Sequence, residues 1–217
     1  MLGRSGSAAP IRPPRILVTG FSVFPGAPVN PTEALVFALR DAPPENGIEA
    51  FRAEVLAVEY AAVAERLSAI GREFRPDIAI HFGLASTCSR FRLERIARNS
   101  HANAREDQAG CLPVGAQVCA GPETFVSTLP LDLIASRLEE AGQPVEWSDD
   151  AGGYLCNTVF TLSVAHACEG FAPAMSGFIH VPLLQKNGAV GTLSLDALVA
   201  VAHVVIDACI EAWRERA

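Results

Sequence analysis

The stretch RILVTG, from Arg15 to Gly20, decides the fold class that the sequence predicts. Its centre is an uninterrupted apolar run, which is typical of a strand buried on both faces of a parallel sheet. After a loop, PTEALVFALRDA begins at Pro31 and carries apolar residues at helical spacing. Proline is favoured at the first position of a helix. The two segments therefore predict a strand, a loop and a helix in succession.

The same alternation continues to the end of the chain. Further strands are predicted over residues 48–58, 77–85, 90–99, 124–129, 145–147 and 176–181. Further helices are predicted over residues 60–74 and from Leu131, Cys156 and Ser194 onward. Strands that alternate with helices favour an α/β sandwich with a mostly parallel sheet.

Length and composition predict one domain. The 217 residues are half hydrophobic, which is enough for one sizeable core and too little for two. Residues 1–14 contain Gly, Ser and three prolines and offer nothing to bury, so we expect an N-terminal tail there. Residues 15–217 are then expected to form a single domain.

The charge balance and the cysteines exclude several classes of protein. With 17 Lys and Arg against 24 Asp and Glu, the net charge is -7, which argues against nucleic acid as a partner. No stretch is apolar enough for a signal peptide or a membrane span, so we expect a soluble cytoplasmic protein without a membrane partner. The six cysteines form no C-x-x-C pair, so neither a zinc site nor a redox dithiol is indicated.

Familiar nucleotide and metal motifs are also missing from the sequence. Gly20 and Gly26 follow the first strand but do not form G-x-G-x-x-G, and no Gly-Lys-Ser/Thr follows them. The five histidines form no H-E-x-x-H helix. These absences argue against a dinucleotide, against ATP and against a zincin centre.

Cys156 is a candidate nucleophile. It follows Gly152 and Gly153 and precedes an apolar run that is expected to be helical. At a helix start, unpaired N–H groups and the positive end of the dipole favour the thiolate, the form that attacks a carbonyl carbon. The alternative is that Cys156 simply packs, as free cysteines very often do.

His180 and Glu94 could complete a catalytic set. His180 lies at the end of a predicted strand, where open α/β sheets form their ligand crevice. Taken alone, it could be a core histidine, and Glu94, between Arg92 and Arg95, could belong to a solvated strand face. A thiol nucleophile needs an imidazole to take its proton, and the imidazole needs a carboxylate to orient it. Cys156, His180 and Glu94 can fill these three roles.

Four segments resemble the motifs of one known family, in the same order along the chain. They are VTGFSVFPGAPVNP (18–31), GLASTCSRFRLERIARN (83–99), AGGYLCN (151–157) and SGFIHVP (176–182). They are similar to the motifs of the pyrrolidone carboxyl peptidases, the type I pyroglutamyl peptidases. The resemblance implies that Cys156 is the nucleophile, His180 the base and Glu94 the catalytic carboxylate.

The resemblance implies further properties. It implies an open three-layer α/β/α sandwich with a mixed, mostly parallel sheet. It also implies no cofactor, a cytoplasmic setting and a homo-oligomer, either a dimer or a tetramer. The substrates would be N-terminally pyroglutamylated peptides, cleaved after the pyroglutamyl residue through a thioester. Pyroglutamate is a neutral lactam, so an apolar slot with a few hydrogen bonds suits it.

By the same resemblance, seven residues would bind substrate. Two phenylalanines would sandwich the ring, an asparagine would hold their loop, and backbone groups of three residues would bond the lactam. An arginine, about one residue later than in the family pattern, would lie near the site. These residues are Phe21 and Phe24, Asn30, Leu84, Tyr154 and Leu155, and Arg105.

Two other functions stay open at this point. The chain could be a related amidase or acyl hydrolase that keeps the triad but has a different substrate range. It could also be a non-catalytic relative that binds a small ligand.

Overall fold

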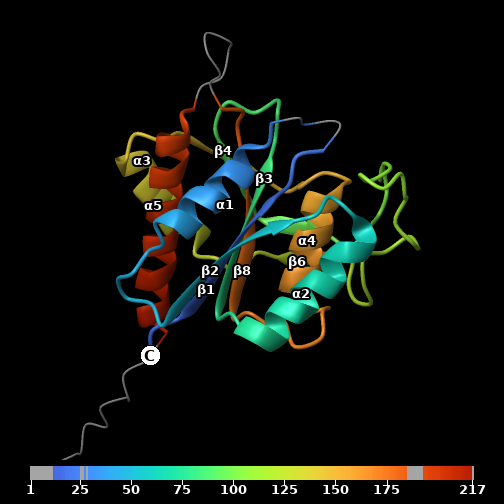
Figure 1. The fold of residues 1–217 in the computed structure, drawn as a ribbon, viewed down its shortest axis with the longest axis horizontal. Coiled ribbons are helices and arrows are strands. Elements are labelled where there is room, and N and C mark those ends of the chain that lie inside the picture. The colour runs from blue at the N-terminus through green and yellow to red at the C-terminus, as the bar shows by residue number, and fades with distance from the viewer. Residues whose placement is uncertain (1–11, 25–26, 28, 185–192, 217) are drawn as a thin grey trace, which may run out of the picture.

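A six-stranded sheet runs through the centre of the computed structural model, which describes residues 12–24, 27, 29–184 and 193–216 (Figure 1). The strand order is β2-β1-β3-β8-β4-β7. Neighbouring strands are parallel except for β4, which runs antiparallel to β8. The predicted mixed, mostly parallel sheet is thereby confirmed. The strands are β1 (Arg15–Phe21), β2 (Ala50–Leu56), β3 (Ile78–Leu84), β4 (Phe91–Glu94), β7 (Val145–Ser148) and β8 (Met175–Val181).

Helices cover both faces of the sheet, which confirms the three layers (Figure 1). One face carries α1 (Pro31–Asp41), α3 (Leu131–Glu140) and α5 (Leu195–Arg214), and the other carries α2 (Tyr60–Phe74) and α4 (Leu155–Val164). Each helical layer packs against its own hydrophobic core, and the sheet separates the two cores.

The opening strand shows why the central sheet strands are apolar throughout. In β1, Ile16 and Val18 lie in the core beneath α1 and α5, while Leu17 lies in the core beneath α2 and α4. All three side chains are fully buried. Successive side chains of a strand point to opposite faces. An uninterrupted apolar run is therefore what a strand between two helical layers requires.

The start of α1 follows from its sequence. Asn30 precedes the helix with extended backbone, and its Oδ1 accepts a hydrogen bond of 3.1 Å from the N–H of Thr32. Pro31 occupies the first turn, where its missing N–H costs nothing. Such a cap stabilises a helix by about 1 kcal/mol. The cap also fixes where the loop after β1 ends.

The prediction of a single strand over residues 90–99 is wrong. It divides into β4, in the main sheet, and β5 (Ile96–Arg98), which pairs with β6 (Thr124–Val126) as a separate two-stranded sheet. Arg95 stands between the two, and its guanidinium binds the Asp149 carboxylate at 2.6 Å. The side chain of Asn157 then bonds both the N–H and the C=O of Arg98. These tertiary contacts draw the chain out of the main sheet.

Most of the predicted tail, residues 1–11, lies outside the described residues. Its last part packs against the domain, contrary to the expectation that the tail buries nothing. Pro14 is buried, and the Arg12 guanidinium binds the carboxylates of Asp77 at 2.6 Å and Glu49 at 3.1 Å. The indole N–H of Trp213 donates to the Arg12 carbonyl at 2.9 Å. Residues 12–14 therefore join the end of α5 to the amino-terminal edge of the sheet.

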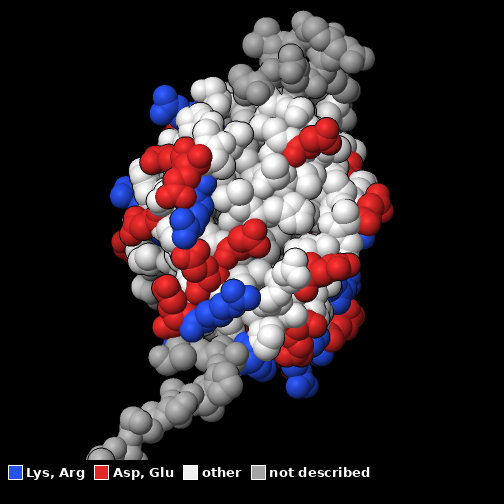
Figure 2. All heavy atoms as spheres, turned by 90° about the vertical axis from the view of Figure 1, so that its left-hand side faces the viewer, with Lys and Arg blue, Asp and Glu red and all other residues white. Residues whose placement is uncertain are grey.

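Figure 2 shows the outer face of the molecule on the side of α1, α3 and α5. Charged side chains gather on its lower and outer parts, while a broad area in its upper middle is uncharged. Among the residues that the structure describes, no helix is both long and apolar enough to cross a membrane.

Candidate active site

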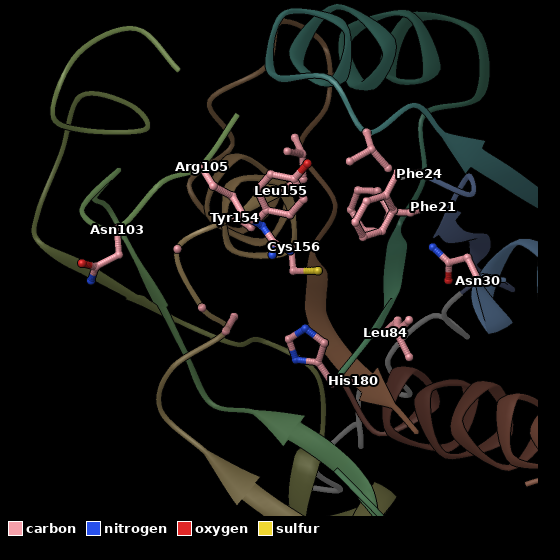
Figure 3. A pocket seen from close by; sticks show the side chains of 14 residues that line it. Phe21, Phe24, Asn30, Leu84, Asn103, Arg105, Tyr154, Leu155, Cys156 and His180 are labelled. Atoms are coloured by element: carbon pink, nitrogen blue, oxygen red, sulfur yellow. The ribbon is translucent and has the colours of Figure 1, made fainter. Parts of the chain in front are cut away.

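A pocket of about 340 Å³ opens at the carboxyl ends of the parallel strands, beside the start of α4 (Figure 3). This is the edge at which open α/β sheets bind ligands. Both Cys156 and His180 border the pocket, as do all seven residues that the family resemblance assigns to the substrate. The complete lining is Phe21, Phe24, Asn30, Val58, Leu84, Asn103, Arg105, Ala151, Gly152, Gly153, Tyr154, Leu155, Cys156 and His180.

Cys156 lies in the first turn of α4, and its sulfur points into the pocket (Figure 3). Tyr154, the residue that precedes the helix, supplies no side-chain cap. The first N–H groups of a helix have no partner within the helix, so those of α4 are available to a ligand. Cys156 is only partly buried, whereas Cys168 and Cys209 are buried in the core. The position fits a reactive cysteine better than a packing one.

Gly83 makes room for the Cys156 sulfur. A Cβ atom at this position would lie 2.8 Å from Sγ and 2.6 Å from Cζ of Phe178. Contacts that short do not occur for real Cβ atoms, so any side chain here would displace the sulfur or the ring. Gly83 also pairs with His180 in the parallel register of β3 and β8, so it lies beside both reactive groups.

Glu94 and His180 meet because β4 runs antiparallel to β8. Arg92 lies opposite His180 and Glu94 lies opposite Phe178, so Glu94 and His180 are diagonal neighbours on one face of the sheet. Glu94 Oε1 lies 2.7 Å from His180 Nδ1. The glutamate is fully buried and the histidine is 5% exposed. The second oxygen, Oε2, has no hydrogen-bond partner among the described residues.

These neighbours hold His180 in its charged form. Burial alone would lower the pKa of His180. The charge and hydrogen bond of the Cys156 sulfur, followed by those of Glu94, outweigh burial and raise the pKa to about 9. At neutral pH the ring is therefore an imidazolium between a sulfur and a carboxylate. This arrangement supplies an acid next to the candidate nucleophile.

One end of the pocket is apolar. Phe21, Phe24 and Leu84 lie on the same side of the Cys156 sulfur (Figure 3). The Phe21 ring packs against Phe178 with 6.4 Å between ring centroids. Asn30 donates from Nδ2 to the Ser22 carbonyl at 3.1 Å, which ties the loop between the two phenylalanines to the start of α1. The end is shaped for a flat, mostly apolar group.

The opposite rim is aromatic and cationic. The Arg105 guanidinium stands over the Tyr154 ring, 4.2 Å from its centroid, a distance at which a cation and an aromatic ring attract. The Tyr60 hydroxyl donates to the Arg105 carbonyl at 3.1 Å, and that of Tyr154 donates to the Glu106 carbonyl at 3.3 Å. Burial raises the pKa of Tyr60 to about 12, so its hydroxyl stays a donor.

A buried carboxylate ties this rim to α2. Asp107 accepts the N–H of Tyr60 at 2.9 Å, where α2 begins, and also the N–H groups of Ala109 and Cys111. Burial would raise the pKa of Asp107, but these backbone donors lower it below its usual value. The carboxylate therefore caps α2 from a distant loop. It also fixes the segment that carries Arg105.

Five lining residues were not predicted: Val58, Asn103, Ala151, Gly152 and Gly153. A Cβ on Gly153 would meet the carbonyl oxygens of Ala102 and Asn103, each at 2.8 Å. Gly153 thus allows two loops to meet at the rim. The glycine pair signalled a close approach, but nothing in the sequence indicated Asn103.

In the described part of the chain, no three His, Cys, Asp or Glu residues gather in a way that could hold a metal ion. The reactive side chains that border the pocket are those of Cys156 and His180.

Comparisons with known proteins agree with this geometry. The family whose sequence model matches the chain is described as pyroglutamyl peptidase, and the match covers residues 14–212. The chain belongs to the pyroglutamyl peptidase family. A pyrrolidone-carboxylate peptidase of Pyrococcus furiosus is 40% identical over 178 residues, which are 80% of this chain and 83% of the relative. Another, of Vibrio vulnificus, is 35% identical and covers 91% of this chain and 93% of the relative.

The fold is also shared with solved members of the family. A crystal structure of the pyrrolidone carboxyl peptidase of Pyrococcus furiosus superimposes with a TM-score of 0.82 at 35% identity. The superposition covers 92% of this chain and 99% of that one. The α/β/α architecture that the resemblance implied is therefore the one this chain shares with solved members of the family.

Proposed function

We propose that this chain is a cysteine omega-peptidase that hydrolyses the amide bond after an N-terminal pyroglutamyl residue. The observation that carries the proposal is the buried contact of 2.7 Å between Glu94 and His180, whose ring lines the same pocket as Cys156. Relatives at 35–40% identity bear the name pyrrolidone-carboxylate peptidase. Site and family support the same reaction.

The proposed mechanism starts from the thiolate and imidazolium pair. The Cys156 sulfur attacks the pyroglutamyl carbonyl carbon, and the N–H groups at the start of α4 stabilise the oxyanion. The carbon–nitrogen bond then breaks as His180 gives its proton to the leaving amine, which leaves a thioester on Cys156. A water molecule next gives a proton to His180 and attacks the thioester, so that pyroglutamate departs and the thiolate returns. Glu94 orients the ring and stabilises its charged form.

The substrate ring would occupy the apolar end of the pocket. Phe21 and Phe24 would contact its two faces, while the loop that carries them is held by Asn30. Backbone groups of Leu84, Tyr154 and Leu155 would bond the lactam N–H and C=O, and Arg105 would close the rim over Tyr154. A neutral lactam suits such a site because it brings few polar groups to satisfy and no charge to desolvate.

The reaction as written needs no metal or cofactor, and we propose none. The proposed substrates are N-terminally pyroglutamylated peptides, with no nucleic-acid or membrane partner. We also propose a cytoplasmic location, which fractionation of cells that express the protein would test. Recovery with the membrane or secreted fraction would contradict it.

The test of the reaction is hydrolysis of a pyroglutamyl amide of aminocoumarin. Cys156→Ser is expected to lower kcat/KM by at least about 10³-fold, because a hydroxyl is a far weaker nucleophile than a thiolate. Cys111→Ser is the matched control, since Cys111 is exposed and does not border the pocket. If Cys156→Ser retained the wild-type rate, the assignment of the nucleophile would be wrong.

We further propose that a single domain spanning residues 15–217 assembles into a homodimer or tetramer. The uncharged area on the outer face of the α1, α3 and α5 layer supports this (Figure 2). On α1, Phe37 is 49% exposed, and buried aromatic side chains dominate interface energetics. Light scattering at micromolar concentration measures the mass. A monomer at all concentrations would contradict the proposal.

A further inference from the structure

A second pocket adjoins the candidate active site. Its volume is about 530 Å³, and it shares Asn103, Gly152 and Gly153 with the first pocket. The rest of its lining is polar apart from Ala102 and Ala116, and it includes the charged side chains of Arg98, Glu123 and Asp150. The mechanism proposed above uses none of these three. The two pockets thus differ sharply in chemistry across a shared border.

The border between the pockets is open at Gly152. A Cβ atom there would meet no other atom within 4 Å, and the residue has a φ of +82° that favours glycine. In the view of Figure 3, Asn103 lies on the opposite side of Cys156 from Phe21 and Phe24, and its side chain points away from the sulfur. A chain that leaves the apolar end past Cys156 therefore meets this border next.

A peptide substrate needs such an exit. With the pyroglutamyl ring at the apolar end, the scissile bond lies at Cys156 and the leaving amine lies beside His180. Every residue beyond the bond brings a backbone N–H and C=O, which apolar walls cannot satisfy. We propose that the second pocket binds the part of the peptide that follows the scissile bond. This inference rests on the proposed function.

Charge in the second pocket predicts which leaving peptides it favours. The Arg98 Nε lies 3.7 Å from Asp150 Oδ1 and donates to the Asp149 carbonyl at 3.2 Å, so its charge is already compensated. The Glu123 side chain is exposed and forms no ion pair with the described residues. Two carboxylates against one guanidinium leave the pocket negative. It therefore favours a leaving peptide with a lysine or arginine over one with an aspartate or glutamate.

The test compares kcat/KM for two peptides, pyroglutamyl-Ala-Lys-amide and pyroglutamyl-Ala-Glu-amide, at low ionic strength. For the wild type we expect the lysine peptide to be favoured about two- to fivefold, the range of one solvent-exposed charge pair. Glu123→Lys is expected to remove or reverse this preference. Salt at 0.5 M should shrink the preference, because exposed charges are screened.

Glu139→Lys is the matched control. Glu139 is an exposed glutamate on α3, on the other face of the sheet. The same change of charge there should keep the wild-type preference. An equal preference in all three proteins, or a change in the Glu139 variant as large as in the Glu123 variant, would overturn the inference.

The aminocoumarin amide separates this inference from the proposed function. Its leaving group is too short to fill the second pocket. If the wild type fails to hydrolyse it, the proposed function is wrong. If the wild type hydrolyses it but Glu123→Lys leaves the preference between the two peptides unchanged, only the second-pocket assignment is wrong.

Discussion

His81 and His180 stand on neighbouring parallel strands and face the same helix, yet they are held in opposite charge states. In the register of β3 and β8, His81 pairs with Phe178, and Gly83 pairs with His180. Burial lowers the pKa of His81 to about 3, while the pKa of His180 is raised to about 9. The Phe178 ring lies between them, with its centroid 6.5 Å from that of His81 and 4.9 Å from that of His180.

Burial does not explain the difference, because His81 is fully buried and His180 is only 5% exposed. Their partners do. His81 Nδ1 lies 2.7 Å from the Thr19 hydroxyl and Nε2 lies 2.9 Å from the Ser163 hydroxyl, and both hydroxyls are neutral. His180 lies between a carboxylate and a sulfur. The neutral partners of His81 do not offset the effect of burial, so its pKa is lowered. The ionisable partners of His180 more than offset burial, so its pKa is raised.

Within the comparison of the two histidines, the largest expected effect comes from removing the charge of Glu94, the carboxylate beside His180. Glu94→Gln keeps the size of the side chain but removes the charge. We expect kcat/KM for the aminocoumarin amide to fall by about 10²-fold or more, because the ring loses its orienting carboxylate. The pH profile should change as well. For the wild type we expect kcat/KM to fall as pH rises through about 9, where the imidazolium is lost.

In Glu94→Gln this alkaline fall should move to lower pH, since the carboxylate no longer favours the charged ring. Glu146→Gln is the control, because Glu146 pairs with Arg92 on the same sheet at 2.6 Å and does not touch the ring. A merely structural Glu94 would lower the rate without moving the profile, and that result would refute its role at His180.

A smaller effect is expected from His81, and it concerns stability. The folded protein keeps His81 neutral down to about pH 3, whereas a histidine of the unfolded chain takes a proton near pH 6.5. The unfolded state therefore binds more protons as pH falls between these values. The difference in protonation of His81 should therefore lower the free energy of unfolding by up to about 1.4 kcal/mol for each unit by which the pH decreases.

His81→Gln should make the acid side of this stability curve shallower, because the replacement cannot take a proton. Urea unfolding at a series of pH values between about 6.5 and 4 measures the slope. His203→Gln, on α5, controls for the substitution itself. An unchanged slope in His81→Gln would show that the buried ring is not the group that resists protonation.

His180 affects stability at the other end of the pH scale. Its folded pKa is raised, so the stability that it contributes is fully present below about pH 6.5 and is lost as pH rises through about 9. The two histidines thus limit the stable range from opposite sides. This follows from their partners and not from their positions in the sheet.

Much of the fold could be predicted because local patterns agree with the tertiary structure. The helix over residues 60–74 begins and ends as predicted, because its apolar residues recur every three or four positions and form one buried face. The break at Arg95 could not be predicted. It depends on Asp149 and Asn157, which lie more than fifty residues further along the chain, and nothing local in RFRLERIARN indicates it.

Some residues of the site could likewise be predicted from the sequence, and others could not. Cys156 and His180 are recognisable because each stands at the start or end of a predicted element, Cys156 three residues after Gly153 and His180 two residues before Pro182. The opposite state of His81 was not predicted, because its hydroxyl partners come from distant segments. The border at Asn103 was also missed, because it forms only where two irregular loops meet. Contacts between loops produce no periodic pattern in the sequence from which they could be predicted.

The most direct test of the triad is the protonation of the His180 ring itself. NMR of protein labelled with ¹⁵N in its histidine rings reports the charge of each ring as pH is raised, and the spectrum of His180→Gln assigns the signal. We predict that His180 stays an imidazolium through neutral pH and loses its proton near pH 9. A His180 that loses its proton at or below pH 6.5 would contradict the account, because the sulfur and the carboxylate would then not be holding the charged ring.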